Sequence, residues 1–326
     1  MASAELYRFE SIPVTKHWAG GRLASILPGV AITIPPGTGE LIELIDAGSM
    51  SSVVASGEDR GRTLGELYRA EPEVFDHNGE SATDLGFPIA IKYIDTAAPL
   101  SIQVHPRDEF DAAGALVRRG KSESWLVLAA ANGAVVYQGL RPGLGRGEFE
   151  RALKAGMPEE TLNEQPVGVG DFLYNPQGMI HAIGGGLTVL EIQQGCDVTY
   201  RLWDFPHGGP PRPMQVEDGL KAADFELAPS QIRHLGHRPG AAELQAEGPY
   251  RVVSITAEEA TVRELDSARF TILVCVEGSC DITARTDSRL RPAIMKAGDT
   301  VLATAGFEKL EVYPSRRCRL IEVRAG

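Results

Sequence analysis

Short, β-rich segments that follow one another with almost no helical sequence between them constrain this chain more than any other feature. Seven of them fill its middle part, and each ends near Gly, Pro or Asn. They cover 89–95, 100–106, 124–130, 134–140, 171–176, 187–194 and 198–205. Strands joined without helical crossovers pair antiparallel, so the pattern predicts an all-β fold. The Ala-Asn-Gly sequence at 131–133 predicts a hairpin turn between two of these strands.

Helical periodicity is confined to three stretches, 62–75, 146–156 and 216–225, and Gly156 is a suitable C-cap for the second. A Pro- and Gly-rich stretch at 237–250 is typical of a linker. Beyond it the strand pattern resumes, at 250–258, 269–282, 299–306 and 310–323. We therefore expect two units, a larger one over 1–236 and a smaller one over 237–326.

The two units share a weak internal similarity. Residues 170–183 and 298–312 both begin Gly-Asp, continue with alternating apolar residues and then turn. The second copy lacks the histidine of the first. The smaller unit is therefore expected to have a related fold without the chemistry of the larger one.

Composition restricts the partners. The net charge is −12, which argues against nucleic acid or an anionic membrane surface as a partner. Any anionic substrate must be held by a few local cations. The four cysteines show no CxxC spacing, and the N-terminal sequence has neither the basic region nor the apolar region of a signal peptide. We therefore expect a cytoplasmic protein that acts on a small molecule.

Two local patterns suggest a metal site. Gln103 and His105 alternate with Val104, so a strand would present both to one side, and Glu123 opens the next strand. The second pattern, G-x5-P-x-G-x2-H, ends at His181. Two imidazoles, a carboxylate and an amide oxygen suit Zn²⁺ or another first-row divalent ion. Spacing alone equally allows both histidines to be ordinary structural residues.

Several motifs, read in order, resemble the type I mannose-6-phosphate isomerases of the cupin superfamily. They are LSIQVHP (100–106), GKSE (120–123), PQGMIHAIGGG (176–186) and LEIQQGCDVTYRLWDF (190–205). The resemblance implies an all-β bicupin, with two antiparallel jelly-roll barrels and a few added α-helices. It also implies one zinc ion per chain, or another divalent metal.

The resemblance extends to individual positions. It implies metal ligands at Gln103, His105, Glu123 and His181. It places Arg201, Glu191, Lys121, Ser101 and Glu40 in or beside the active site. Phosphate requires cations and hydroxyl donors, for which Ser101, Lys92 and Arg107 are candidates.

The implied reaction interconverts mannose 6-phosphate and fructose 6-phosphate through an enediol. A metal ion would polarise the carbonyl, and Arg201 would stabilise the developing oxyanion. The base stays open between Glu191, Glu40 and a metal-bound water. The residues also allow structural readings, in which Glu191 and Arg201 form an ion pair across neighbouring strands and Lys92 and Lys121 are solvated.

Three other functions stay open at this stage. The protein could isomerise a different, unphosphorylated sugar. It could be a metal-dependent cupin oxygenase, although a fourth ligand at Gln103 speaks against the usual set of two histidines and one carboxylate. It could also bind a sugar without turnover. We expect a monomer or a homodimer.

Overall fold

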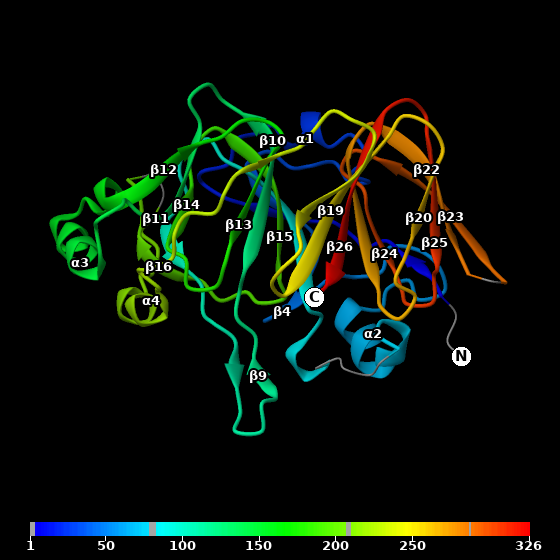
Figure 1. Ribbon diagram of the computed structural model, residues 1–326, viewed down its shortest axis with the longest axis horizontal. Coiled ribbons are helices and arrows are strands. Elements are labelled where there is room, and N and C mark those ends of the chain that lie inside the picture. The colour runs from blue at the N-terminus through cyan, green and yellow to red at the C-terminus, as the bar shows by residue number, and fades with distance from the viewer. Residues whose placement is uncertain (1–3, 78–82, 207–209, 287) are drawn as a thin grey trace.

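Four antiparallel β-sheets are stacked along the long axis of the molecule in this computed structural model (Figure 1). The structure describes residues 4–77, 83–206, 210–286 and 288–326. The outer two sheets have five and four strands, and the inner two have seven and six. Each outer sheet closes a barrel with its inner neighbour, and the predicted all-β antiparallel fold is confirmed.

The first barrel carries all the sequence motifs. Its seven-stranded sheet has the order β17 (Arg233–His234), β13 (Asp171–Asn175), β10 (Glu123–Ala130), β15 (Leu187–Gln194), β6 (Ile89–Asp95), β3 (Thr38–Leu44) and β2 (Ile12–Thr15). Its five-stranded sheet has the order β12 (Leu162–Pro166), β11 (Val135–Leu140), β14 (His181–Ile183), β7 (Ile102–Val104) and β16 (Tyr200–Trp203). Apolar side chains from both sheets, among them Trp125, Val136 and Val189, fill one end of the barrel.

The second barrel is built in the same way. Its six-stranded sheet has the order β1 (Leu6–Tyr7), β24 (Thr300–Ala303), β21 (Thr271–Glu277), β26 (Cys318–Ala325), β19 (Tyr250–Ala257) and β18 (Gly240–Gln245). Its four-stranded sheet has the order β20 (Thr261–Glu264), β25 (Lys309–Pro314), β22 (Ser279–Arg285) and β23 (Leu290–Lys296). Two short pairs complete the strands: β4 (Asp46–Ala47) with β5 (Met50–Ser51), and β8 (Glu109–Phe110) with β9 (Leu116–Arg118).

The two inner sheets pack face to face and share one hydrophobic core. All eight residues of β15 are buried, because this strand is covered on both faces. With a side-chain period of two, Val189 faces the first barrel, while Leu190 and Ile192 join Tyr250 and Ile321 of the second. The residues between the barrels are therefore as inaccessible as those inside them.

Helices are short and peripheral. They are α1 (Leu23–Ile26), α2 (Leu64–Ala70), α3 (Arg146–Ala155) and α4 (Val216–Ala222), with 3₁₀ turns at Pro72–Val74, Thr83–Leu85 and Pro158–Thr161. The helix expected over 62–75 is interrupted before Pro72, which favours an extended conformation in the residue that precedes it. Gly156 ends α3 in the left-handed conformation, as predicted. Helices α3 and α4 cover the outer face of the five-stranded sheet (Figure 1).

Two sequence predictions are wrong in detail. Residues 131–133 do form a tight turn, but β10 and β11 on either side belong to different sheets and do not pair. Residues 237–250 are not a linker, since β18 lies within them and pairs with β19. The strand contains no β-branched or aromatic residue, so its composition does not indicate a strand. Its residues other than Leu244 are Gly240, Ala241, Ala242, Glu243 and Gln245. The predicted unit boundary falls between β17 and β18, but β1 crosses it to pair with β24.

All four cysteines are buried free thiols. Among the described residues, no helix has the length and apolar character needed to cross a membrane.

Candidate metal centre and active site

Three side chains from facing sheets meet at one end of the first barrel. His105 follows the last residue of β7, His181 opens β14, and Glu123 opens β10 in the opposite sheet. The Nε2 atoms of His105 and His181 lie 3.1 Å from Glu123 Oε2 and Oε1 respectively. All three residues are at most 1% exposed. The potential ligand atoms lie within 4.8 Å of one another, so one ion could contact all of them.

The backbone fixes how the two imidazoles are protonated. His105 Nδ1 lies 3.0 Å from the carbonyl oxygen of Val198, and His181 Nδ1 lies 2.9 Å from that of Met179. A carbonyl only accepts, so both Nδ1 atoms carry the proton and donate it. Burial, aided by the charge of Lys121, lowers the pKa of His105 to about 3, which keeps this ring neutral. His105 Nε2 therefore presents a lone pair, and His181 Nε2 faces the same carboxylate.

This donor set fits a divalent cation. Two imidazole Nε2 atoms and a carboxylate converge, and Lys121 Nζ also lies 2.9 Å from Glu123 Oε2. Burial would raise the pKa of Glu123, but nearby Lys121, His105 and His181 outweigh it and hold the pKa well below its usual range. In a tetrahedral zinc site, ligand atoms are separated by about 3.3 Å, close to the distances here. The backbone carbonyls fix the orientation of the two rings, as the hydrogen-bond partners of metal-binding histidines do in known metal sites.

Gln103 joins the same cluster from β7. Its Nε2 lies 3.2 Å from His181 Nε2, and its Oε1 lies 3.3 Å from the hydroxyl of Ser101. A half-turn of the amide would exchange the two atoms and direct Oε1 toward the centre. Gln103 is therefore placed to supply a fourth ligand.

A cavity of about 350 Å³ opens beside this cluster and extends across the barrel mouth. This volume lies within the range of small-molecule sites, roughly 300–1,000 Å³. Five basic and three acidic side chains line it. They are Lys16, Lys92, Lys121, Arg201 and Arg212, with Glu40, Glu191 and Asp197. A chain with net charge −12 thus concentrates cations where an anionic substrate would enter.

The seven-stranded sheet contributes a row of alternating charges to the cavity wall. Lys92 Nζ lies 2.9 Å from Glu191 Oε1, and Trp125 donates its indole N–H to Glu191 Oε2 at 3.0 Å. Lys16 pairs with Glu40 at 3.0 Å. Burial opposes the charge on Lys92, but Glu191 and Glu40 outweigh it and raise the pKa of this lysine. Burial likewise opposes ionisation of Glu40, but Lys92 and Lys16 lower its pKa, so this carboxylate is ionised.

Arg201 faces this row from the five-stranded sheet. Its Nη1 donates to the Pro213 carbonyl at 2.8 Å, and its Nε is buried with no hydrogen-bond partner among the described residues. Arg212 forms a two-pronged ion pair with Asp204. Arg201 therefore keeps donor capacity for a ligand in the cavity.

Most of the predicted site residues come together. Ser101, Gln103, Lys121, Lys92, Glu191, Glu40 and Arg201 all line the cavity. Arg107 does not, because its guanidinium pairs with Asp224 on the outer side of the loop. The suggested structural pair of Glu191 and Arg201 is absent from the described contacts, since Glu191 pairs with Lys92. Lys121 is 4% exposed and contacts Glu123 at 2.9 Å, so it is not solvated.

Sequence reasoning missed Lys16, which lines the cavity together with Trp18. Both come from the segment that follows β2, where no motif marks them. Only the pairing of β2 with β3 brings that segment to the barrel mouth.

The fold and the site together define a protein of the cupin class with two barrels, one of which carries a His-Glu-His cluster that could hold a metal ion. None of the known protein-family models matches the chain. It is 31% identical to a mannose-6-phosphate isomerase of Streptococcus mutans, over 76% of this chain and 83% of that protein. It is 32% identical to mannose-6-phosphate isomerase ManA of Bacillus subtilis, over 69% and 70%. The chain belongs to the type I mannose-6-phosphate isomerase family.

Solved structures agree over nearly the whole chain. The crystal structure of the mannose 6-phosphate isomerase from Bacillus subtilis superimposes with a TM-score of 0.77 at 25% identity, covering 98% of this chain and 99% of that one. A phosphomannose isomerase variant from Salmonella typhimurium shares the fold, with a TM-score of 0.72 at 15% identity and coverage of 98% and 99%.

Proposed function

We propose that this protein interconverts mannose 6-phosphate and fructose 6-phosphate, using one divalent ion, Zn²⁺, held by Gln103, His105, Glu123 and His181. The observation that carries the proposal is the convergence of two imidazoles and an ionised carboxylate at the end of a cation-lined cavity. The names of the relatives support the same substrate and reaction.

The reaction moves a proton from C2 to C1 of the open-chain aldose, while the hydroxyl proton moves from O2 to O1. A metal ion bound at the centre would polarise the carbonyl oxygen as a Lewis acid. Arg201 stays charged and donates from its unpartnered Nε to the enediolate oxygen. Lys121, which touches Glu123 and His105, contributes positive charge at the same end of the cavity.

Two carboxylates of the cavity can exchange the proton with carbon. Glu40 is ionised and reaches the cavity from β3, and Glu191 is held in place by Lys92 and Trp125. Ser101 and Lys92, which line the cavity, would contact the phosphate or a sugar hydroxyl, whereas Arg107, which pairs with Asp224, would not. We also propose that the protein acts in the cytoplasm, a compartment that keeps thiols such as its four buried cysteines reduced.

The test is a coupled assay on mannose 6-phosphate before and after chelation. We expect chelated, dialysed protein to lose at least about 100-fold in kcat, because the loss of a Lewis acid removes several kcal/mol of stabilisation from the transition state. Added Zn²⁺ should restore activity. Elemental analysis of each sample provides the control. Full turnover by protein shown to hold no metal would contradict the proposal.

A further inference from the structure

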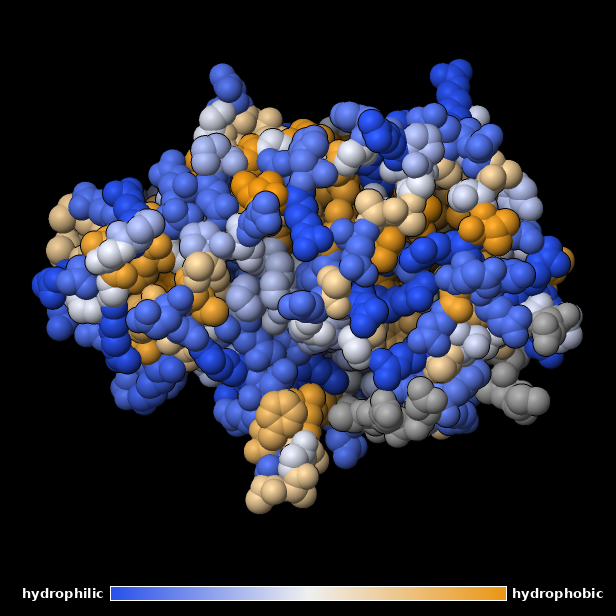
Figure 2. All heavy atoms as spheres, viewed as in Figure 1, coloured by the Kyte–Doolittle hydropathy of each residue, from blue (hydrophilic) through white to orange (hydrophobic). Residues whose placement is uncertain are grey.

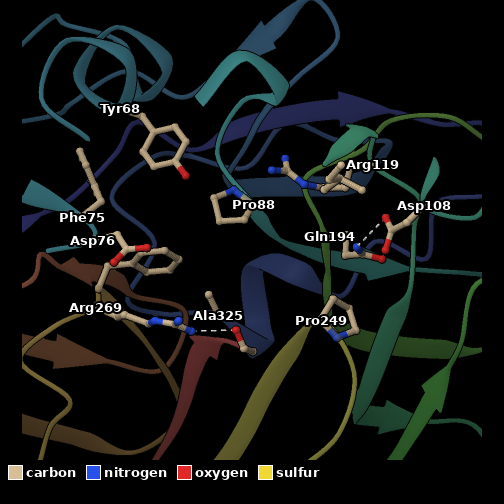
Figure 3. A pocket seen from close by; sticks show the side chains of 13 residues that line it. Tyr68, Phe75, Asp76, Pro88, Asp108, Arg119, Gln194, Pro249, Arg269 and Ala325 are labelled. Atoms are coloured by element: carbon tan, nitrogen blue, oxygen red, sulfur yellow. Dashed lines mark hydrogen bonds between the residues drawn. The ribbon is translucent and has the colours of Figure 1, made fainter. Parts of the chain in front are cut away.

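A second cavity, of about 270 Å³, is lined by Arg119, two residues before Lys121 in the chain (Figure 3). It shares no lining residue with the cavity described above. Tyr68, Phe75 and Phe270 line one side, and Asp108, Arg119 and Gln194 line the other. The second barrel contributes Phe270, so the cavity lies where the two barrels and α2 meet.

Arg119 is the group in this cavity that calls for a ligand. It is 8% exposed, and among the described residues no carboxylate forms an ion pair with it. Its Nη1 donates to the carbonyl oxygens of residues 85–87 and of Gly195, at 2.9 to 3.3 Å. Its Nε and Nη2 make no hydrogen bond to the described residues, and Figure 3 shows the guanidinium directed into the cavity. Asp108 and Asp46 lie near enough to favour this charge but form no ion pair with it, and an anion in the cavity would supply a direct partner.

The opposite wall suits a flat apolar group. Tyr68 and Phe75 are in edge-to-face contact at 5.5 Å, and Phe270 packs on Phe87 at 4.6 Å. Rings of this kind bind another ring through the same offset and edge contacts. The volume is slightly below the roughly 300 Å³ typical of larger ligands, which limits the occupant to a small molecule. We propose that this cavity binds a small planar organic acid, with its acid group on Arg119 and its body against Tyr68, Phe75 and Phe270.

Residues that line the cavity also hold the backbone that carries Lys121 and Glu123. Asp108 Oδ1 accepts from the Gly120 amide at 2.6 Å, and Gln194 Oε1 accepts from the Ser122 amide at 2.7 Å. A β-carbon on Gly120 would lie 2.6 Å from the backbone of 106–108, so the two segments are in close backbone contact. An acid that binds to Arg119 would therefore shift the backbone that positions Lys121 and Glu123. This regulatory part rests on the proposed isomerase function, whereas the binding part does not.

The β8–β9 hairpin offers a matched pair of variants. It protrudes from the molecule as an apolar lobe (Figure 2). Leu116 lines the cavity, while Val117 beside it does not and is 51% exposed. In Leu116→Trp the larger side chain would occupy the cavity, and in Val117→Trp it would add the same bulk outside. Ala325→Phe fills the cavity from the second barrel and serves as an independent blocking variant.

Binding is measured with benzoate as the probe, by calorimetry and by its effect on Tm. Benzamide keeps the ring without the charge, and acetate keeps the charge without the ring. We expect benzoate to bind the wild type and Val117→Trp, and to bind Leu116→Trp and Ala325→Phe at least about tenfold more weakly. Benzamide and acetate should be weaker than benzoate by a similar factor. Equal binding to all four proteins, equal binding of benzamide, or no binding of benzoate would overturn the proposal.

The regulatory part is tested in the same proteins with mannose 6-phosphate at saturation. Benzoate should change kcat of the wild type and Val117→Trp and leave Leu116→Trp unaffected. Inhibition that only raises KM, equally in every variant, would place benzoate in the first cavity and overturn the inference. If the protein showed no isomerase activity, the calorimetric comparison would still decide whether the site exists.

Discussion

The two barrels follow the same strand order, yet among the described residues only the first barrel holds a cluster of side chains that could bind a metal ion. In the inner sheets, the succession β13-β10-β15-β6-β3 of the first barrel is matched by β24-β21-β26-β19-β18 of the second. In the outer sheets, β12-β11-β14-β7 is matched by β23-β22-β25-β20. The weak similarity between 170–183 and 298–312 corresponds to the matched strands β13–β14 and β24–β25.

The difference lies in a few residues at matched places. In the first barrel His181 lies opposite Gln138 on one side and Gln103 on the other. In the second barrel Leu310 lies opposite Ala284 and Arg263. Leu310 is fully buried in an apolar core. The fold therefore supplies the positions, and the side chains at the strand ends decide whether they hold a metal or extend the core.

The first prediction replaces His181 of the first barrel with leucine, the type of residue that β25 of the second barrel carries at Leu310. We expect His181→Leu to reduce kcat/KM by about 1,000-fold, because losing a ligand forfeits several kcal/mol of charge stabilisation. The measurement is the coupled assay, with zinc content determined by elemental analysis. The fold should survive, since leucine occupies the matched place in the second barrel.

Leu310→Ala is the control for that variant. It leaves a cavity in the second core and should lower the free energy of unfolding by about 2–5 kcal/mol. Zinc content and kcat should be unchanged at temperatures where the protein is folded. Loss of zinc in Leu310→Ala, or retention of activity in His181→Leu, would break the contrast between the barrels.

The second prediction concerns a buried glutamate that both barrels keep at the same place. Glu191 lies opposite Trp125, and Glu322 lies opposite Leu273 on the matched strands. Glu191 pairs with Lys92 in the cavity, whereas Glu322 pairs with Arg263 and Arg324. We expect Glu191→Gln to lower kcat about 100-fold, the size of a general acid–base contribution.

Glu322→Gln should leave kcat unchanged and lower the free energy of unfolding by about 1–2 kcal/mol, since Arg263 is only partly buried. Steady-state kinetics and urea unfolding of both variants measure the two effects. Equal losses of kcat would show that Glu191 acts through folding rather than through substrate.

The barrels also show what the sequence could and could not predict. Strands β6 and β15 were predicted to the residue, because β-branched and aromatic residues are concentrated in them and glycine or proline flanks them. The hairpin at 131–133 was predicted wrongly because a turn residue fixes a change of direction and says nothing about which sheet the next strand joins. Edge strand β18, rich in Gly and Ala, gave no signal.

The site residues were likewise predicted well where local motifs mark them and poorly where tertiary contacts decide. Gln103, His105, Glu123 and His181 were predicted from motifs that keep their spacing at strand ends, and the structure brings them together. Their role as ligands stays a prediction. Arg107 was placed at the substrate rim because it follows the metal strand, but Asp224, distant in sequence, draws it outward. Contacts of this kind depend on tertiary packing, which local spacing does not encode.

The third prediction concerns the seam between the barrels. Glu43 on β3 is 6% exposed, near the Arg8–Asp299 ion pair that ties the N-terminal segment to the second barrel. Burial raises the pKa of Glu43 to about 7. The folded protein therefore binds more protons than the unfolded chain between about pH 4.5 and 7, and its stability falls as pH rises through this window.

Glu43→Gln keeps the shape and removes the charge. Because each pKa unit is worth about 1.4 kcal/mol, we expect the variant to be more stable than the wild type by roughly 2–3 kcal/mol at pH 8 and nearly equal to it at pH 4.5. Urea unfolding across this pH range measures the difference. A difference that does not vary with pH would show that Glu43 is paired when ionised.

The smallest expected effect compares the outer faces. Helices α3 and α4 cover the five-stranded sheet and bury Phe149 completely, whereas Ile294 and Val262 on the four-stranded sheet are 65% and 62% exposed. Ile294→Thr should therefore change the free energy of unfolding by less than about 0.5 kcal/mol, because exposed side chains lose little on substitution. Phe149→Ala, the matched change on the covered face, should cost about 3–5 kcal/mol. The free energy of unfolding is measured with urea at several protein concentrations. A comparable cost at Ile294 would mean that the exposed sheet is covered in solution. A cost that grows with protein concentration would identify a second copy of the chain as the cover.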